Sequence, residues 1–111
     1  MEVKHFWFQK DAQSVIVDPS ISRKILAYHE NMMMVEVTFK AGGIGQLHQH
    51  VHEQSTYVIA GKFQFEIDGV KQIIQTGDSV YINPNVLHGC LCLMDGILLD
   101  VFTPHRADFI K

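Results

Sequence analysis

Short runs of alternating apolar and polar residues cover most of the chain and predict β-strands rather than helices. The run at 63–67 shows the pattern clearly, because apolar Phe63, Phe65 and Ile67 alternate with polar residues. Side chains two positions apart on a strand face the same side, so such a run buries one face and exposes the other. Other runs rich in β-branched and aromatic residues predict strands at 15–17, 21–28, 32–39, 55–60, 70–75, 79–82, 88–93 and 97–102.

Turn-forming residues separate these runs. Asp68-Gly69 and Asp95-Gly96 are dipeptides that favour hairpin turns, and Asn83-Pro84-Asn85 also favours a turn. The glycine-rich segment 41–45 is expected to be a flexible connection. Many short strands at regular spacing, with no linker or internal repeat, predict an all-β sandwich or barrel that occupies residues 1–111 as a single domain.

The composition is that of a folded protein without an extreme charge. The chain has 111 residues, 47% of them hydrophobic, and a formal net charge of −3. This hydrophobic fraction favours a packed core over disorder. No basic stripe suggests a nucleic-acid partner, and no apolar run approaches the length of a membrane span.

The cysteines and the N-terminal residues indicate in which cellular compartment the protein is expected. Cys90 and Cys92 are two apart on one predicted strand, a spacing that suits a mutual disulfide poorly. Unpaired thiols fit a reducing compartment, and the first residues lack the pattern of a signal peptide. We therefore expect a cytoplasmic protein in which both cysteines are small buried side chains rather than metal ligands.

Three histidines at alternate positions stand in the segment HQHVHEQ, residues 48–54. On a strand, His48 and His50 would direct two imidazoles to one side, which is what a divalent metal needs from neighbouring ligands. A structural pair of histidines is the alternative. His88, in another predicted strand after the turn at Pro84, could join them, although spacing alone does not show it.

Two spaced motifs resemble those of the cupin family. The first reads Gly42, five residues, His48-Gln49-His50, three residues, Gln54, six residues and Gly61. The second reads Gly77-Asp78, then Pro84, then His88. Every position fits the cupin pattern except Gln54, which stands where a glutamate is usual. The resemblance implies a jelly-roll barrel with a metal ion in its open mouth.

The cupin resemblance also implies the metal ligands, which are His48, His50, Gln54 and His88. The ion would be one divalent transition metal, and Zn, Ni, Co, Mn and Fe all accept histidine-rich sites. This ligand set leaves two alternative roles for His52. It either supports a metal ligand from the rim of the site or is a solvated loop residue. Glu53 points away from Gln54 by strand alternation and is expected at the surface.

Four longer runs are similar to the KdgF family of pectin-degradation cupins. They are RKILAYHENMMMVEV, HEQSTYVIAGKFQFEIDG, PNVLHGCLC and LLDVFTPHRADFIK, and together they extend over roughly residues 20–111. That family has glutamine in place of the usual cupin glutamate, so Gln54 becomes a match. The resemblance implies an enzyme whose small-molecule partner is a 4,5-unsaturated uronate, released by pectate or alginate lyases. The product would be the linear 5-keto-4-deoxyuronate.

Three residues near the C-terminal end are candidates for catalysis. Asp100 interrupts an apolar run, where burial would raise its pKa and suit it to carry protons. A structural carboxylate held by backbone donors or an arginine is the alternative. The resemblance implies that Phe102 lines the substrate pocket and that Arg106 binds the uronate carboxylate. Ordinary core packing for Phe102 and a solvated tail for Arg106 are the alternatives.

Gln54 suggests a hypothesis about the charge of the site. Three neutral imidazoles and a neutral amide would leave the full charge on a divalent ion, whereas a glutamate would cancel part of it. The site would then attract an anionic sugar more strongly.

Two other functions fit the same motifs. One is a cupin dioxygenase or isomerase with a different small substrate, and the other is a non-catalytic cupin that binds a sugar or a metal. A homodimer is also expected, because jelly-roll edges and the apolar segment His5-Phe6-Trp7-Phe8 favour pairing. Packing of that segment on its own barrel is the alternative.

Overall fold

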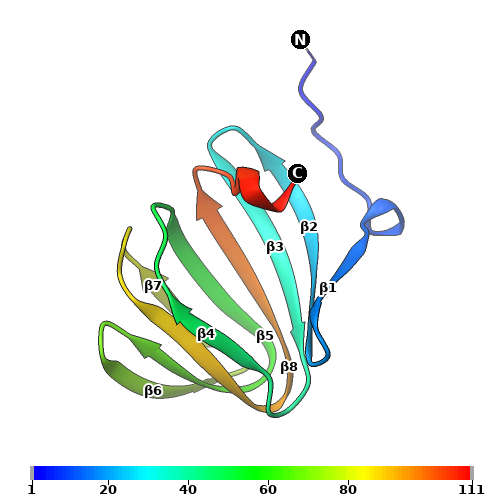
Figure 1. Ribbon diagram of the computed structural model, residues 1–111. Helices are drawn as coiled ribbons and strands as arrows, with labels where there is room; N and C mark the ends of the chain where they lie inside the picture. The colour runs from blue at the N-terminus through cyan, green and yellow to red at the C-terminus, as the bar shows by residue number, and fades with distance from the viewer. Residues whose placement is uncertain (1, 111) are drawn as a thin grey trace.

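The computed structural model describes residues 2–110 and is built almost entirely of β-strands (Figure 1). The strands are β1 (Ser14–Asp18), β2 (Ile21–His29), β3 (Met32–Phe39), β4 (Ile44–His48), β5 (Glu53–Ile67), β6 (Val70–Gln75), β7 (Ser79–Ile82) and β8 (His88–Thr103). Two 3-10 turns are η1 (Gln9–Asp11) and η2 (Ala107–Phe109). The all-β prediction is confirmed, although β4 begins inside the segment 41–45 that we expected to be a flexible connection. Within residues 2–110, no helix is long and apolar enough to cross a membrane.

The long strands β5 and β8 pass through both layers of the barrel. The first half of β5 pairs with β7 and with the second half of β8, whereas its second half pairs with β6 and with the first half of β8. One layer therefore holds β1, β2, β3, β8, β5 and β7, and the other holds β4, β8, β5 and β6 (Figure 1). This is the antiparallel jelly-roll arrangement that the cupin resemblance implied.

The continuity of these strands shows that the predicted hairpin turn at Asp95-Gly96 was wrong. Asp68-Gly69 does form the predicted turn between β5 and β6, with positive φ at both residues. Asp95-Gly96 instead lies inside β8, where the Asp95 carboxylate accepts a hydrogen bond from the backbone N–H of Ala41 at 2.7 Å. Because β5 and β8 change their outer partners near this point, the chain moves from one layer to the other without reversing.

A close approach of two backbones allows this change of layer. A Cβ atom on Gly61 would lie 2.6 Å from the Asp95 carbonyl oxygen, and one on Gly96 would lie 2.5 Å from the Ala60 carbonyl oxygen. Gly61 also has a φ of +92°, which L side chains rarely adopt. Glycine is therefore required on both strands at the crossing.

Apolar side chains from both layers fill the interior. The larger cluster contains Ile21, Phe39, Val58, Phe63, Phe65, Cys92 and Leu98, and a smaller one contains Met33, Val35 and Phe102. Cys90 and Cys92 are both unpaired, and Cys92 is buried in the core, as predicted. Burial raises the pKa of the Cys90 thiol to about 12, so that this group stays protonated and uncharged at neutral pH.

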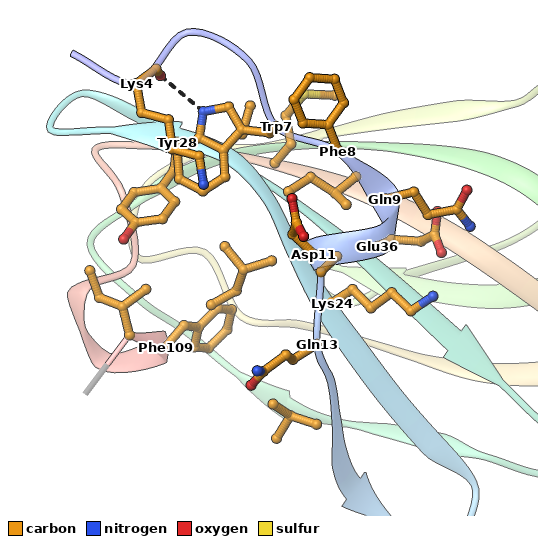
Figure 2. Close-up of a pocket in the computed structure, with 17 residues that line it drawn as sticks. Lys4, Trp7, Phe8, Gln9, Asp11, Gln13, Lys24, Tyr28, Glu36 and Phe109 are labelled. Carbon is orange, nitrogen blue, oxygen red and sulfur yellow. Dashed lines mark hydrogen bonds between the residues drawn. The ribbon is translucent and has the colours of Figure 1, made fainter.

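The N-terminal residues 2–13 form an arm that extends away from the barrel (Figure 1). Trp7 packs on Tyr28 with 4.9 Å between ring centroids, whereas Phe6 and Phe8 remain 77% and 60% exposed. A cavity of about 790 Å³ lies between this arm and β2 (Figure 2). The apolar segment is thus only partly covered by its own barrel, and the expected homodimer stays a prediction because the structure contains one chain.

The crossing of β5 and β8 predicts a specific sensitivity at Gly61. Gly77 offers a matched control, because its φ of +93° is nearly the same but an added Cβ would have open space around it. Gly61→Ala should cost about 2 kcal/mol more than Gly77→Ala, because only the former drives a methyl group into backbone atoms. Thermal denaturation should show this as a Tm lower by roughly 10 °C. Equal Tm losses for the two variants would contradict the steric explanation.

Candidate metal centre

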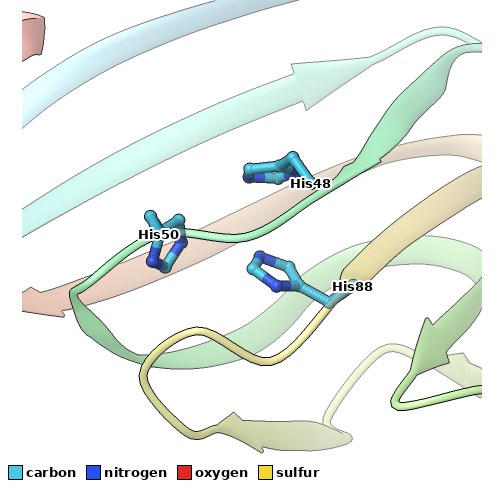
Figure 3. A group of neighbouring side chains, drawn as sticks. All are labelled: His48, His50 and His88. Carbon is cyan, nitrogen blue, oxygen red and sulfur yellow. The ribbon is translucent and has the colours of Figure 1, made fainter.

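Three histidines from two parts of the chain converge in the barrel (Figure 3). His48 is the last residue of β4, His50 lies in the connection to β5, and His88 begins β8, where it pairs with His48. Their ligand atoms lie within 4.8 Å of one another. The predicted spatial neighbourhood of His88 is therefore confirmed.

Backbone carbonyl groups hold all three imidazole rings in the same tautomer. The Nδ1 atoms of His48 and His88 lie 2.8 Å from the carbonyl oxygens of Gln46 and Val86, and Nδ1 of His50 lies 3.1 Å from that of His52. A carbonyl oxygen only accepts, so each Nδ1 must carry the proton. In the neutral rings, the Nε2 lone pairs are then free to bind a metal.

The environment of His88 Nε2 fits the binding of a cation by this cluster. His88 Nε2 is buried and has no hydrogen-bond partner among the described residues. A buried polar atom without a partner is costly unless a ligand satisfies it. Burial is also the main cause that lowers the pKa of His50 and of His88, which favours the neutral, metal-binding form of both rings.

Gln54, on β5, is the fourth candidate metal ligand. Its side chain is 6% exposed, and its Oε1 atom lies 3.0 Å from His50 Nε2. Because the His50 proton is on Nδ1, Nε2 of His50 and Oε1 of Gln54 direct lone pairs toward each other. Two ligand atoms that bind one transition-metal ion at right angles would lie about 3 Å apart, which is close to the distance seen here. The three histidines and Gln54 therefore fit the predicted ligand set. Glu53 points outward, as predicted, and accepts hydrogen bonds from Tyr81 and Thr103.

The turn before β8 helps to hold His50. Asn85 adopts a positive φ of 63°, and its backbone N–H donates to the His50 carbonyl oxygen at 2.7 Å. The predicted turn at Asn83-Pro84-Asn85 therefore does more than connect β7 with β8. It joins the segment that carries His50 to the one that carries His88.

Asp100 enters the same region from β8. A cavity of about 330 Å³ is lined by Asp100 together with His48, Gln54, His88, Phe102 and Arg106. Every predicted ligand and catalytic candidate except His50 thus lines one cavity. Burial raises the pKa of Asp100 to about 6, against the opposing effect of a hydrogen bond from Thr56. A carboxyl group with this pKa can both accept and release a proton near neutral pH.

Arg106 lines this cavity with a side chain only 12% exposed, so it does not lie in a solvated tail. Its guanidinium carbon is 5.0 Å from the ring centroid of Phe102 and 4.2 Å from that of Phe109. Asp108 binds its Nε and Nη2 atoms at 3.0 and 2.8 Å. These bonds use two of the five N–H donors and fix the plane of the guanidinium, so an anionic ligand could bind the remaining donors.

Sequence reasoning missed three residues of this site: Thr56, Arg23 and Phe109. Thr56 is buried beside Gln54 and Asp100, and its position two residues after Gln54 was an available signal. Arg23, on β2, stacks on Phe109 at 3.8 Å, so this ring lies between two guanidinium groups. No local pattern indicated that residues so far apart in sequence would meet.

His52 takes the rim position that was one of its two predicted roles. Its Nδ1 atom lies 3.0 Å from the carbonyl oxygen of Pro104, and its ring contacts those of His50 and Phe102 at their edges. His52 is outside the three-histidine cluster. It holds the turn that leads to Arg106.

Metal binding should depend on His88 and not on His52. Saturating Zn²⁺ or Ni²⁺ should raise the Tm of the wild-type protein by several degrees, because only the folded chain assembles the ligands. His88→Leu should lose this rise, yet keep a similar or higher Tm without metal, because it removes the unsatisfied buried nitrogen. His52→Ala should retain the rise. Scanning calorimetry with and without metal tests both, and an undiminished rise in His88→Leu would exclude the proposed ligand set.

Comparisons with known proteins agree with this geometry. The family model described as the cupin domain matches residues 35–102. The pectin degradation protein KdgF of Dickeya dadantii (strain 3937) is 45% identical over 92 residues, which is 81% of this chain and 84% of that protein. The structure of KdgF from a Halomonas species is 34% identical with a TM-score of 0.91, covering 96% of this chain and 99% of that one. An RmlC-like cupin from Shewanella frigidimarina NCIMB 400 is 36% identical with a TM-score of 0.92, covering 96% of each chain. The chain therefore belongs to the cupin family and is a relative of KdgF.

Proposed function

We propose that this protein acts in pectin degradation and converts 4,5-unsaturated uronate monosaccharides into the linear 5-keto-4-deoxyuronate. The similarity to the Dickeya dadantii protein, which is named for pectin degradation, supports the pathway. The observation that carries the reaction is that Asp100, a carboxyl group with a pKa of about 6, lines one cavity with His48 and His88, two members of the three-histidine cluster. That combination supplies proton transfer beside a metal site.

The reaction requires the movement of one proton. Ring opening breaks the bond between C1 and the ring oxygen, and the anomeric hydroxyl loses its proton as C1 becomes an aldehyde. The ring oxygen keeps the electrons of the broken bond, and the enolate that remains at C5 becomes a ketone when C4 gains a proton. One proton leaves O1 and one arrives at C4, so substrate and product are isomers. A single group that first accepts and then donates a proton satisfies this balance.

Asp100 is the residue to which we assign this proton transfer. Its carboxylate is held by Thr56 at 2.6 Å, so its position is fixed before a substrate arrives. A divalent metal held by His48, His50, His88 and Gln54 would supply Lewis acidity toward oxygen atoms of the substrate. Asp100 carries the proton between the anomeric oxygen and C4.

Arg106 and Phe102 position the substrate in this proposal. The free N–H donors of Arg106 suit the uronate carboxylate, and the planar ring of Phe102 forms an apolar wall beside His50 at 5.7 Å between centroids. Arg23 adds a second positive charge behind Phe109. Two arginines near the mouth favour an anionic sugar over a neutral one.

The direct test uses freshly generated unsaturated galacturonate monomer. The protein should accelerate the loss of the ultraviolet absorbance of the conjugated double bond, in air and under anaerobic conditions alike, and chelation followed by metal return should abolish and restore the rate. No acceleration over the spontaneous reaction would overturn the proposal. Oxygen dependence would favour a dioxygenase, and binding without turnover would favour a sensor.

Asp100→Asn supplies the control for this test. The variant should keep the fold and its metal, while turnover falls by about 10²- to 10⁴-fold, the usual contribution of a positioned acid–base group. Circular dichroism and metal analysis would verify the first two properties. Turnover at the wild-type rate would remove Asp100 from the mechanism.

The two arginines should affect substrate binding to different degrees. Arg106→Gln should raise KM by about tenfold or more, because it removes charged hydrogen bonds to the carboxylate. Arg23→Gln should raise KM by about two- to fivefold, through charge alone. Lys24→Gln is the matched control, since it removes one positive charge from the adjacent position on β2, on the face toward the N-terminal arm. A KM increase of the same size for Lys24→Gln would indicate a general charge effect.

A further inference from the structure

Thr56 lies at the centre of a buried chain of hydrogen bonds between the metal cluster and Asp100. Its side chain is 1% exposed on the inward face of β5, directly opposite Asp100 in the register of β5 and β8. Thr56 Oγ1 donates to Asp100 Oδ1 at 2.6 Å, and Gln54 Nε2 donates to Thr56 Oγ1 at 2.9 Å. Gln54 Oε1 then faces His50 Nε2 at 3.0 Å.

The single proton of the Thr56 hydroxyl decides which groups donate and which accept in this series of hydrogen bonds. A threonine hydroxyl has one O–H donor, and here the Asp100 carboxylate receives it. The remaining lone pairs of Oγ1 can only accept, so the neighbouring group from residue 54 must be a donor. An amide satisfies this with its NH₂ group, and its carbonyl oxygen is thereby turned toward the histidines.

The same count of protons explains why a glutamate would fit poorly at position 54. A carboxylate there would compete with Asp100 for one hydroxyl proton, and one of the two buried acceptors would lose its partner. The amide of Gln54 is therefore matched to Thr56 and Asp100, in addition to any effect on the charge of a bound ion.

We propose that Thr56 is a positioning residue that aims the carbonyl oxygen of Gln54 at the metal cluster and holds the carboxylate of Asp100 in the cavity. Only an effect of Thr56 on turnover rests on the proposed function. The orientation of Gln54 concerns the metal site itself, so it can be tested without any substrate and would stand if the uronate reaction were excluded.

The first experiment compares two substitutions at position 56 by metal affinity. Thr56→Ser keeps the hydroxyl group, whereas Thr56→Val keeps the shape and removes both hydrogen bonds. The affinity for Zn²⁺, measured by competition with a chromogenic chelator, should fall by about 10- to 100-fold in Thr56→Val and by less than about threefold in Thr56→Ser. Equal affinities in Thr56→Val and the wild type would overturn the proposal, as would an equal loss in Thr56→Ser.

The second experiment reverses the direction of the hydrogen bonds in metal-free protein. Gln54→Glu alone should lower the Tm. Adding Asp100→Asn should restore more than about half of the loss, because the asparagine amide can donate to Thr56 while the hydroxyl proton turns to the new carboxylate. Additive Tm changes would overturn the proposal, and this result can be obtained even if Thr56→Val fails to fold.

A control separates this coupling from simple repulsion between two carboxylates. The Gln54→Glu and Asp100→Asn substitutions are repeated in the Thr56→Val background, where no hydroxyl links the two positions. In that background, adding Asp100→Asn to Gln54→Glu should restore a clearly smaller part of the lost Tm, because only direct repulsion between the two carboxylates is relieved. An undiminished restoration would assign the coupling to charge and reject the role of Thr56.

Discussion

The pairing of β5 with β8 is the interaction on which the rest of this structure depends. These two strands connect both layers of the barrel, and their register sets Thr56 opposite Asp100 and Gln54 opposite Phe102. A shift of β5 by one residue would turn Gln54 and Thr56 to the outer face and away from the β8 residues, because neighbouring residues on a strand face opposite sides. The close approach at Gly61 and Gly96 fixes where the strands cross between layers. The register of β5 with β8 therefore determines both the packing of the core and the geometry of the site.

The site combines candidate metal ligands that carry no negative charge with charged groups at a short distance from them. The neutral histidines and Gln54 contribute no negative charge, whereas Asp100 lies one hydrogen-bonded step away through Thr56. Arg106 and Arg23 lie around Phe109 at the mouth. In the proposed reaction, this separation would place positive charge near the carboxylate of an anionic sugar and a proton carrier near its ring. In this proposal, the polarity of the cavity orients the substrate as much as its shape does.

Local patterns predicted the strands and the opposite directions of Glu53 and Gln54, because strand alternation is a property of neighbouring residues, whereas the inward direction of Gln54 came from the cupin resemblance. They did not distinguish the turn at Asp68-Gly69 from the crossing at Asp95-Gly96, since the outcome depends on which distant strands are available to pair. The cupin resemblance supplied His88 as a ligand, and spacing alone could not have done so. Thr56 and Arg23 escaped notice for the same reason. Their partners are far away in sequence: Asp100 meets Thr56 through the strand register, and Phe109 meets Arg23 because η2 packs against β2.

The carbonyl groups that hold the three imidazole rings have a consequence for the energetics of ion uptake. Each ring is already locked by its Nδ1–H group, so the rotational entropy that flexible ligands lose on binding has been lost during folding. The tautomer is also set in advance, so no proton has to move from one ring nitrogen to the other when an ion binds. The cluster should keep its shape whether or not an ion is bound, and exchange of one ion for another should be governed by the ion's own dehydration rather than by rearrangement of the protein.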